Sequence, residues 1–123
     1  MILGIGIDII GVSRFDQGET NQAFLNKVFT PKEIEECLAQ RRPAEGFAEK
    51  FVLKEAFMKA IGAGIRQKVW FTNIEVLNGE NGKPKIIPEK MAKHYFDALN
   101  AKEIQLSSSS SGGVVVGVVV LTA

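Results

Sequence analysis

Hydrophobic and polar positions along this chain change their period several times, and each change marks a predicted element. Runs rich in β-branched residues predict strands, whereas apolar residues at helical spacing predict helices. Strands are predicted at residues 2–10, near 71–78 and 84–87, and in a final hairpin from 103 to 121. Helices are predicted near 20–28 and 31–40, at 44–62 and at 88–99. This order of elements is typical of an α+β protein.

Turn and cap residues separate the predicted elements. Asn-Gly pairs within residues 78–82 mark a turn between the two middle strands, and the glycines at 112–113 mark the turn of the final hairpin. Pro31, with Thr30 as its cap, and Pro88 suit the first position of a helix. No internal repeat or linker divides the chain, which therefore reads as a single domain.

The long helix predicted at 44–62 has charged side chains inside its apolar arc, namely Lys54, Glu55 and Lys59. Because burying an unpaired charge is costly, these groups need each other, a metal, a ligand or water in a cleft. The simplest alternative is an ordinary surface salt bridge between Glu55 and Lys59, which are spaced at i and i+4.

The strand at 2–10 also carries a charge within an apolar run that predicts a buried strand. Alternation places Asp8 on the same face as Gly4 and Gly6, so the glycines leave space beside its carboxylate. Glycines in a strand indicate close approach by a ligand or by another backbone. The alternative is that Asp8 caps the turn near Gly11.

Two carboxylates from different elements, with lysines beside them, suit Mg²⁺ and a phosphorylated ligand. Magnesium usually takes one or two protein carboxylates and completes its shell with water and substrate phosphate. Lys54 and Lys59 would then balance phosphate charge. A zinc cluster is not competitive, because the chain has one cysteine, Cys37, and one histidine, His94.

Two motifs resemble the holo-[acyl-carrier-protein] synthases, the small members of the 4′-phosphopantetheinyl transferase family. One is the Gly-x-Gly-x-Asp strand at residues 4–8, followed by Arg14, and the other is the Lys-Glu-Ala helix motif within residues 51–62. Segments 24–34 and 74–84 also resemble this family, so most of the chain is covered. The resemblance implies its fold, a small antiparallel sheet packed against a long helix.

The resemblance also implies a reaction, the transfer of phosphopantetheine from coenzyme A to a serine of an apo acyl carrier protein. Asp8 and Glu55 match the family's Mg²⁺ ligands, and Lys59 matches a lysine near the scissile pyrophosphate. Glu55 and Lys59 are therefore the predicted catalytic residues. The base that deprotonates the serine is either Glu55 or a metal-bound water.

Further residues are expected to contact the substrates. Lys54, Gly62, Gly64 and Ser109 are predicted to contact coenzyme A, the first through phosphate and the glycines through their backbone. Arg14 matches a family arginine that contacts the acidic carrier protein, and Lys27 is a weaker second candidate. The alternative for Arg14 is a solvated side chain in a turn.

The C-terminal hairpin departs from the family pattern of Ser-Leu-Ser-His before the turn. Ser107 and Ser109 match the two serines, but Ser110 stands where the histidine is expected. This departure leaves open a catalytically weak module that binds coenzyme A or a carrier protein. A Mg²⁺-dependent nucleotide hydrolase is a third possibility, although it would lack a water-positioning group beyond Glu55.

Composition and charge give no support for a nucleic-acid or membrane partner, and they do not identify the activity. With 123 residues and a formal net charge of +1, the chain gives no support for nucleic-acid binding. No apolar run is long enough to span a membrane, and no secretory signal precedes the first strand, so a cytoplasmic location is expected. Because larger family members contain two copies of this unit, a single copy implies self-association, and the resemblance points to a homotrimer with active sites shared between neighbours.

Overall fold

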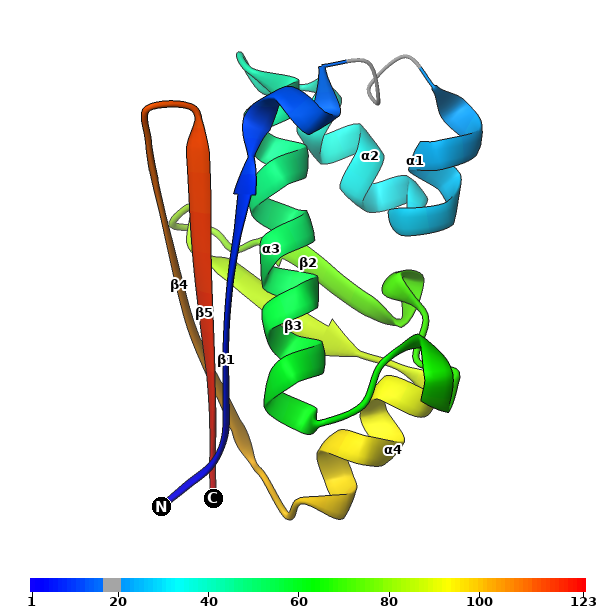
Figure 1. The fold of residues 1–123 in the computed structure, drawn as a ribbon, viewed down its shortest axis with the longest axis vertical. Coiled ribbons are helices and arrows are strands. Elements are labelled where there is room, and N and C mark those ends of the chain that lie inside the picture. The colour runs from blue at the N-terminus through cyan, green and yellow to red at the C-terminus, as the bar shows by residue number, and fades with distance from the viewer. Residues whose placement is uncertain (17–20) are drawn as a thin grey trace.

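The computed structural model describes residues 1–16 and 21–123, and its long helix α3 contacts two small antiparallel sheets (Figure 1). The strands are β1 (Ile2–Gly11), β2 (Ile74–Asn78), β3 (Pro84–Pro88), β4 (Glu103–Ser111) and β5 (Val114–Thr122). The α-helices are α1 (Gln22–Val28), α2 (Pro31–Leu38), α3 (Pro43–Ile61) and α4 (Lys90–Ala98). Short 3-10 helices lie at η1 (Val12–Phe15), η3 (Ile65–Gln67) and η4 (Phe71–Asn73).

The larger sheet has the strand order β1-β5-β4, so the two chain ends lie side by side. Ala123 N–H donates to the carbonyl of Met1 at 3.2 Å, and both termini meet at the lower end of the sheet in Figure 1. Asp8 pairs with Gly117, which in turn pairs with Ser108. The smaller sheet, β2 and β3, crosses behind α3 in the same view.

Two glycines in β1 allow α3 to lie directly against the strand. A Cβ atom added at Gly6 would lie 1.9 Å from the carbonyl oxygen of Ala56, and one at Gly4 would lie 2.1 Å from that of Ala60. No side chain fits at such a distance. The sequence predicts that either a ligand or another backbone approaches these glycines, and in the structure it is the backbone of α3.

Aromatic rings from η1, from α1 and from Phe29 pack against one end of α3. Phe15 contacts Phe24, Phe29 and Phe51, with ring centroids 5.6 to 6.1 Å apart. Thr30 caps α2 as predicted: its side chain accepts from Glu33 N–H, and the Glu33 side chain accepts from Thr30 N–H. Most faces of α3 are buried, so it is the centre of the core.

The predicted order of elements is confirmed, and two element ends differ from the prediction. Residues 71–73 form η4, so the strand predicted near 71–78 begins only at Ile74. Pro88 ends β3 and is not the first residue of α4, whose cap is Glu89. The predicted start of the first helix, residue 20, lies outside the described residues.

The prediction that β1 is buried is wrong for one of its faces. Ile5, Ile7 and Ile9 are 62%, 60% and 64% exposed, whereas Gly6 and Ile10, on the face toward α3, are buried. An uninterrupted apolar run indicates two covered faces, but in this chain only the inner face is covered. The outer face is an exposed apolar surface.

Candidate active site

Asp8 and Lys59 meet where β1 lies against the C-terminal half of α3. The Lys59 ammonium donates to the Ile7 carbonyl at 2.9 Å and lies 3.3 Å from Asp8 Oδ1. Asp8 is mostly buried, whereas Lys59 is 53% exposed. No backbone N–H of the turn after β1 donates to Asp8 among the described residues, so its predicted alternative role as a turn cap is wrong.

Glu55 completes the cluster from one turn earlier on α3. Its pKa is raised, first because burial penalises the carboxylate and second because the charge of Asp8 is close; Lys59 and Arg14 oppose this shift. These four charges therefore act on one another across β1, η1 and α3. The described ion pairs join Lys59 to Asp8 and not to Glu55, so the simple surface salt bridge is wrong.

A groove of about 450 Å³ opens beside this cluster. Glu55 and Lys59 line it together with the chain that follows α3, which includes Gly62 and Gly64. Gly62 has a φ of +71° and ends the helix in the left-handed conformation, where its N–H donates to the carbonyls of the last turn. The contact of both glycines with coenzyme A stays a prediction.

Residues beyond the helix motif also line the groove, and the sequence reasoning missed them. They are Ile65, Arg66, Gln67 and Phe71, and they lie beside Met58 of the motif itself and Ala63. Phe71 lies at the start of a segment for which the sequence predicts a strand, and the short η3 helix has no hydrophobic period from which to predict it. Their only available signal was their position directly after a helix that carries two candidate catalytic groups.

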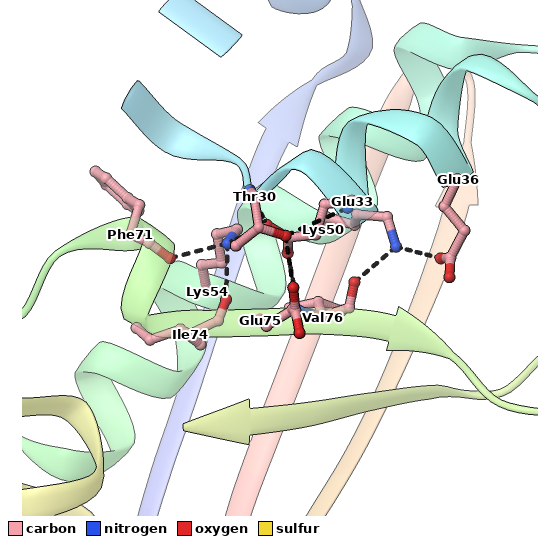
Figure 2. Close-up of polar contacts among 9 residues, drawn as sticks. All are labelled: Thr30, Glu33, Glu36, Lys50, Lys54, Phe71, Ile74, Glu75 and Val76. Carbon is pink, nitrogen blue, oxygen red and sulfur yellow. Dashed lines mark hydrogen bonds and ion pairs between the residues drawn. The ribbon is translucent and has the colours of Figure 1, made fainter. Parts of the chain in front are cut away.

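Lys54 does not face this groove, and the prediction that it contacts a phosphate is wrong. Its side chain is 0% exposed, and its ammonium donates to Glu33 Oε1 at 2.8 Å and to two backbone carbonyls (Figure 2). All three of its N–H groups therefore have partners inside the protein. Burial lowers its pKa, and the adjacent Glu33 carboxylate opposes this shift.

Ser109 lies apart from the Asp8–Glu55 cluster in this chain. It is exposed on β4, and its register partner in β5, Val116, pairs with Ile9 on the outer face of the sheet. Ser109 lines a second pocket, of about 380 Å³, with Arg41 and the N-terminal part of α3. Its contact with coenzyme A stays a prediction.

The serine at the family's histidine position has an internal partner. Ser110 Oγ donates to Glu45 Oε1 at 3.0 Å, and Ser108 Oγ donates to Glu49 Oε2 at 2.6 Å. Both bonds tie β4 to α3, and the sequence reasoning predicted neither of them. The hairpin therefore forms with its altered sequence, and its turn is made by Gly112 and Gly113 with φ values of +60° and +79°.

The partner candidates Arg14 and Lys27 are both exposed. Arg14 belongs to η1, directly after the strand that carries Asp8, and its guanidinium lies 5.8 Å from the centroid of the Phe51 ring. The contact leaves the charged end of Arg14 at the surface. Cys37 is buried, and burial raises the pKa of its thiol to about 12, as expected for a structural cysteine.

The described residues contain no group of three or more His, Cys, Asp or Glu side chains that could hold a metal ion. Asp8 and Glu55 are a pair of carboxylates, which is a donor set that suits Mg²⁺ more than zinc. Across the described part of the chain, no helix is long and apolar enough to cross a membrane.

Comparison with known proteins identifies the class to which this fold and site belong. Residues 4–119 match the model of the 4′-phosphopantetheinyl transferase superfamily, so the chain belongs to this family. It is 39% identical to a holo-[acyl-carrier-protein] synthase of Geotalea daltonii, over 98% of both chains. It is 42% identical to that of Trichlorobacter lovleyi, over 100% of this chain and 99% of the relative.

Solved structures agree with the α+β fold. The holo-[acyl-carrier-protein] synthase of Neisseria meningitidis superposes with a TM-score of 0.87 at 33% identity, over 100% of both chains. That of Bacillus anthracis, solved in complex with CoA (3′,5′-ADP), has a TM-score of 0.80 at 34% identity, over 100% of this chain and 99% of the other. The predicted 4′-phosphopantetheinyl transferase fold is confirmed.

Proposed function

We propose that this chain is a holo-[acyl-carrier-protein] synthase, which transfers 4′-phosphopantetheine from coenzyme A to a serine of apo acyl carrier protein. The observation that carries this proposal is the cluster of Asp8, Glu55 and Lys59 beside a groove. Full-length relatives with this name, one of them solved with coenzyme A, support the substrate. The second product is adenosine 3′,5′-bisphosphate.

In the proposed reaction, the serine hydroxyl oxygen forms a bond to the phosphorus that carries pantetheine. The bond from this phosphorus to the bridging pyrophosphate oxygen breaks, and its electron pair leaves with adenosine 3′,5′-bisphosphate. We assign the serine proton to Glu55, because its carboxylate lines the groove in which the reacting phosphate would lie. Lys59, exposed at the groove, balances the charge that develops on the leaving phosphate.

Asp8 and Glu55 would hold Mg²⁺. The fit rests on their chemistry here: both are oxygen donors, and the charge of Asp8 helps to raise the Glu55 pKa, so a cation between them would relieve the repulsion. When bound, Mg²⁺ would offset negative charge on the pyrophosphate. Chelation of divalent metal should abolish transfer, and added Mg²⁺ should restore it.

The alternative, a catalytically weak module that binds coenzyme A or carrier protein, rests on Ser110. Its hydroxyl donates to Glu45, so Ser110 has less hydrogen-bonding capacity for a substrate than a histidine would have. The cluster at Asp8 weighs against this alternative, since a binding module has little need for two carboxylates and a lysine at one groove.

The proposed assembly is a homotrimer, and the proposed location is the cytoplasm. The exposed outer face of β1, formed by Ile5, Ile7 and Ile9, supports self-association because burying it would remove apolar surface from water. Ser109 lies beside this face. A neighbouring subunit packed there would bring Ser109 next to a ligand held by that neighbour.

One experiment tests the proposed function directly. Apo acyl carrier protein is incubated with this protein, coenzyme A and Mg²⁺, and its intact mass is measured. We expect a gain of one phosphopantetheine group with the wild type and none with Asp8→Ala or Glu55→Ala, while circular dichroism shows that both variants fold. Turnover near the wild-type rate in either variant at saturating Mg²⁺ would remove these carboxylates from the site.

A further inference from the structure

Lys54 and Glu33 form a buried ion pair that joins three parts of the fold (Figure 2). Glu33 Oε1 accepts from Lys54, and its Oε2 accepts from the Val76 backbone N–H at 2.8 Å. Lys54 also donates to the carbonyl of Phe71 at 2.9 Å and to that of Ile74 at 2.7 Å. The pair thus connects α2 and α3 to the segment that runs from η4 into β2.

Phe71 connects this buried network to the groove. It lines the groove together with the helix residues Glu55 and Lys59, and its carbonyl accepts from Lys54, the residue next to Glu55 in α3. Its ring stacks on that of Phe51, with centroids 5.3 Å apart. One helix therefore supplies both the candidate catalytic side chains and the ammonium that binds the Phe71 carbonyl.

We propose that Lys54, paired with Glu33, is a positioning residue. It keeps Phe71 and its backbone, here called the Phe71 wall, in place along the groove and so sets the affinity for coenzyme A. This inference rests on the proposed function, because it takes coenzyme A as the ligand of the groove. Without the ammonium, the Phe71 and Ile74 carbonyls lose a shared donor, and the wall can move away from Glu55.

The chain contains a matched control for the effect of a buried lysine alone. Lys50, one turn earlier on α3, is 1% exposed and donates to Glu36 Oε1 and to the Val76 carbonyl, both at 2.7 Å. Glu36 in turn accepts from Asn78 N–H at 3.1 Å. These contacts also join α2, α3 and β2, but none of them involves a residue that lines the groove.

The test compares two double variants, Lys54→Met with Glu33→Gln and Lys50→Met with Glu36→Gln. Each removes both charges of an ion pair that contains a buried lysine, so neither variant leaves one charge unpaired. Both should melt at lower temperature than the wild type. Only the Lys54 double variant should raise the KM for coenzyme A, by roughly tenfold or more, since small displacements in a site have large effects. Its dissociation constant, from calorimetry, should rise equally.

Equal changes in the two double variants, or an unchanged affinity in both, would overturn the positioning role. Phe71→Ala tests the same wall if the Lys54 variant does not fold, because it retains the carbonyl bound by Lys54. It should raise the KM for coenzyme A, and an unchanged KM would also overturn the inference. A wild type that neither binds coenzyme A nor modifies the carrier would instead contradict the proposed function.

Discussion

Two lysines of α3 show how position decides the role of a residue. Lys54 is fully buried, and its ammonium is paired with Glu33 inside the protein. Lys59, five residues later, is 53% exposed beside Asp8. Burying an ammonium is tolerated only with complete hydrogen bonding, and such a group has no donor left for a ligand. Lys59 keeps one side toward the groove and is the lysine available for chemistry.

Lys59→Ala should lower kcat at least tenfold and change the melting temperature little. A partly exposed ion pair contributes under about 1 kcal/mol to stability, whereas the charge on the leaving phosphate develops only in the transition state. Steady-state kinetics and thermal unfolding check both parts. Lys93→Ala, which breaks the exposed pair with Asp97, is the matched control and should alter neither. Loss of stability with full activity would return Lys59 to a structural role.

Arg14→Glu should raise the KM for the acidic carrier protein and leave that for coenzyme A nearly unchanged. The net charge of the protein is only +1, so attraction depends on local basic side chains, and such contacts act mainly on encounter and weaken with salt. Added salt should have the same selective effect on the wild type. Lys102→Glu, at an exposed position next to β4, is the control. Equal effects on both substrates would remove Arg14 from the docking surface.

At the scale of elements, the site depends on the close contact between β1 and α3. Asp8 comes from the strand, and Glu55 and Lys59 come from the helix, so the distance between the two elements sets the distance between the charged groups. Gly4 and Gly6 are what permit that distance. The role of these glycines is therefore to bring two elements together and not to provide flexibility.

Gly6→Ala should destabilise the fold by about 3 kcal/mol, because its new methyl group would meet the backbone of α3 and force the elements apart. Activity should fall with it, since Asp8 would move away from Glu55. Chemical denaturation measures the change in free energy of unfolding. Gly11→Ala is the control: its Cβ would lie 3.9 Å from the Ser13 hydroxyl, and it should cost under about 1 kcal/mol.

At the scale of the whole molecule, the outer face of β1 is an apolar surface that nothing in a single chain covers among the described residues. It combines three exposed isoleucines with the neighbouring strand β5, whose outward positions are valines. A small domain has little core to spare, so covering this face in an assembly would stabilise it. The second pocket, at Ser109, lies at the far edge of the same sheet.

Ile7→Glu should convert the proposed homotrimer to a monomer, because it would place a charge in the centre of a desolvated interface. Light scattering after gel filtration measures the mass of each species. Leu38→Glu, at an exposed apolar position at the end of α2, should leave the assembly unchanged. A wild type that is monomeric at micromolar concentration would contradict the trimer, and with it the role of Ser109 at a shared site.

The sequence by itself determined the order of elements and three charged candidates for the site. Strand and helix periods, turn glycines and the Thr30 cap depend on local interactions, so their signals lie within a few neighbouring residues. The charges at Asp8, Glu55 and Lys59 were visible because each interrupts an apolar pattern that is otherwise regular. The structure brings these three side chains together.

Only the tertiary structure decided which charges face a ligand and which face the core. Lys54 and Lys59 lie in similar sequence surroundings. The groups that accept hydrogen bonds from Lys54, namely Glu33 and two backbone carbonyls, come from distant segments of the chain. The exposed face of β1 is likewise invisible in an apolar run, because coverage of a strand depends on the elements packed against it. Local pattern specifies the elements, but burial and partners depend on how those elements meet.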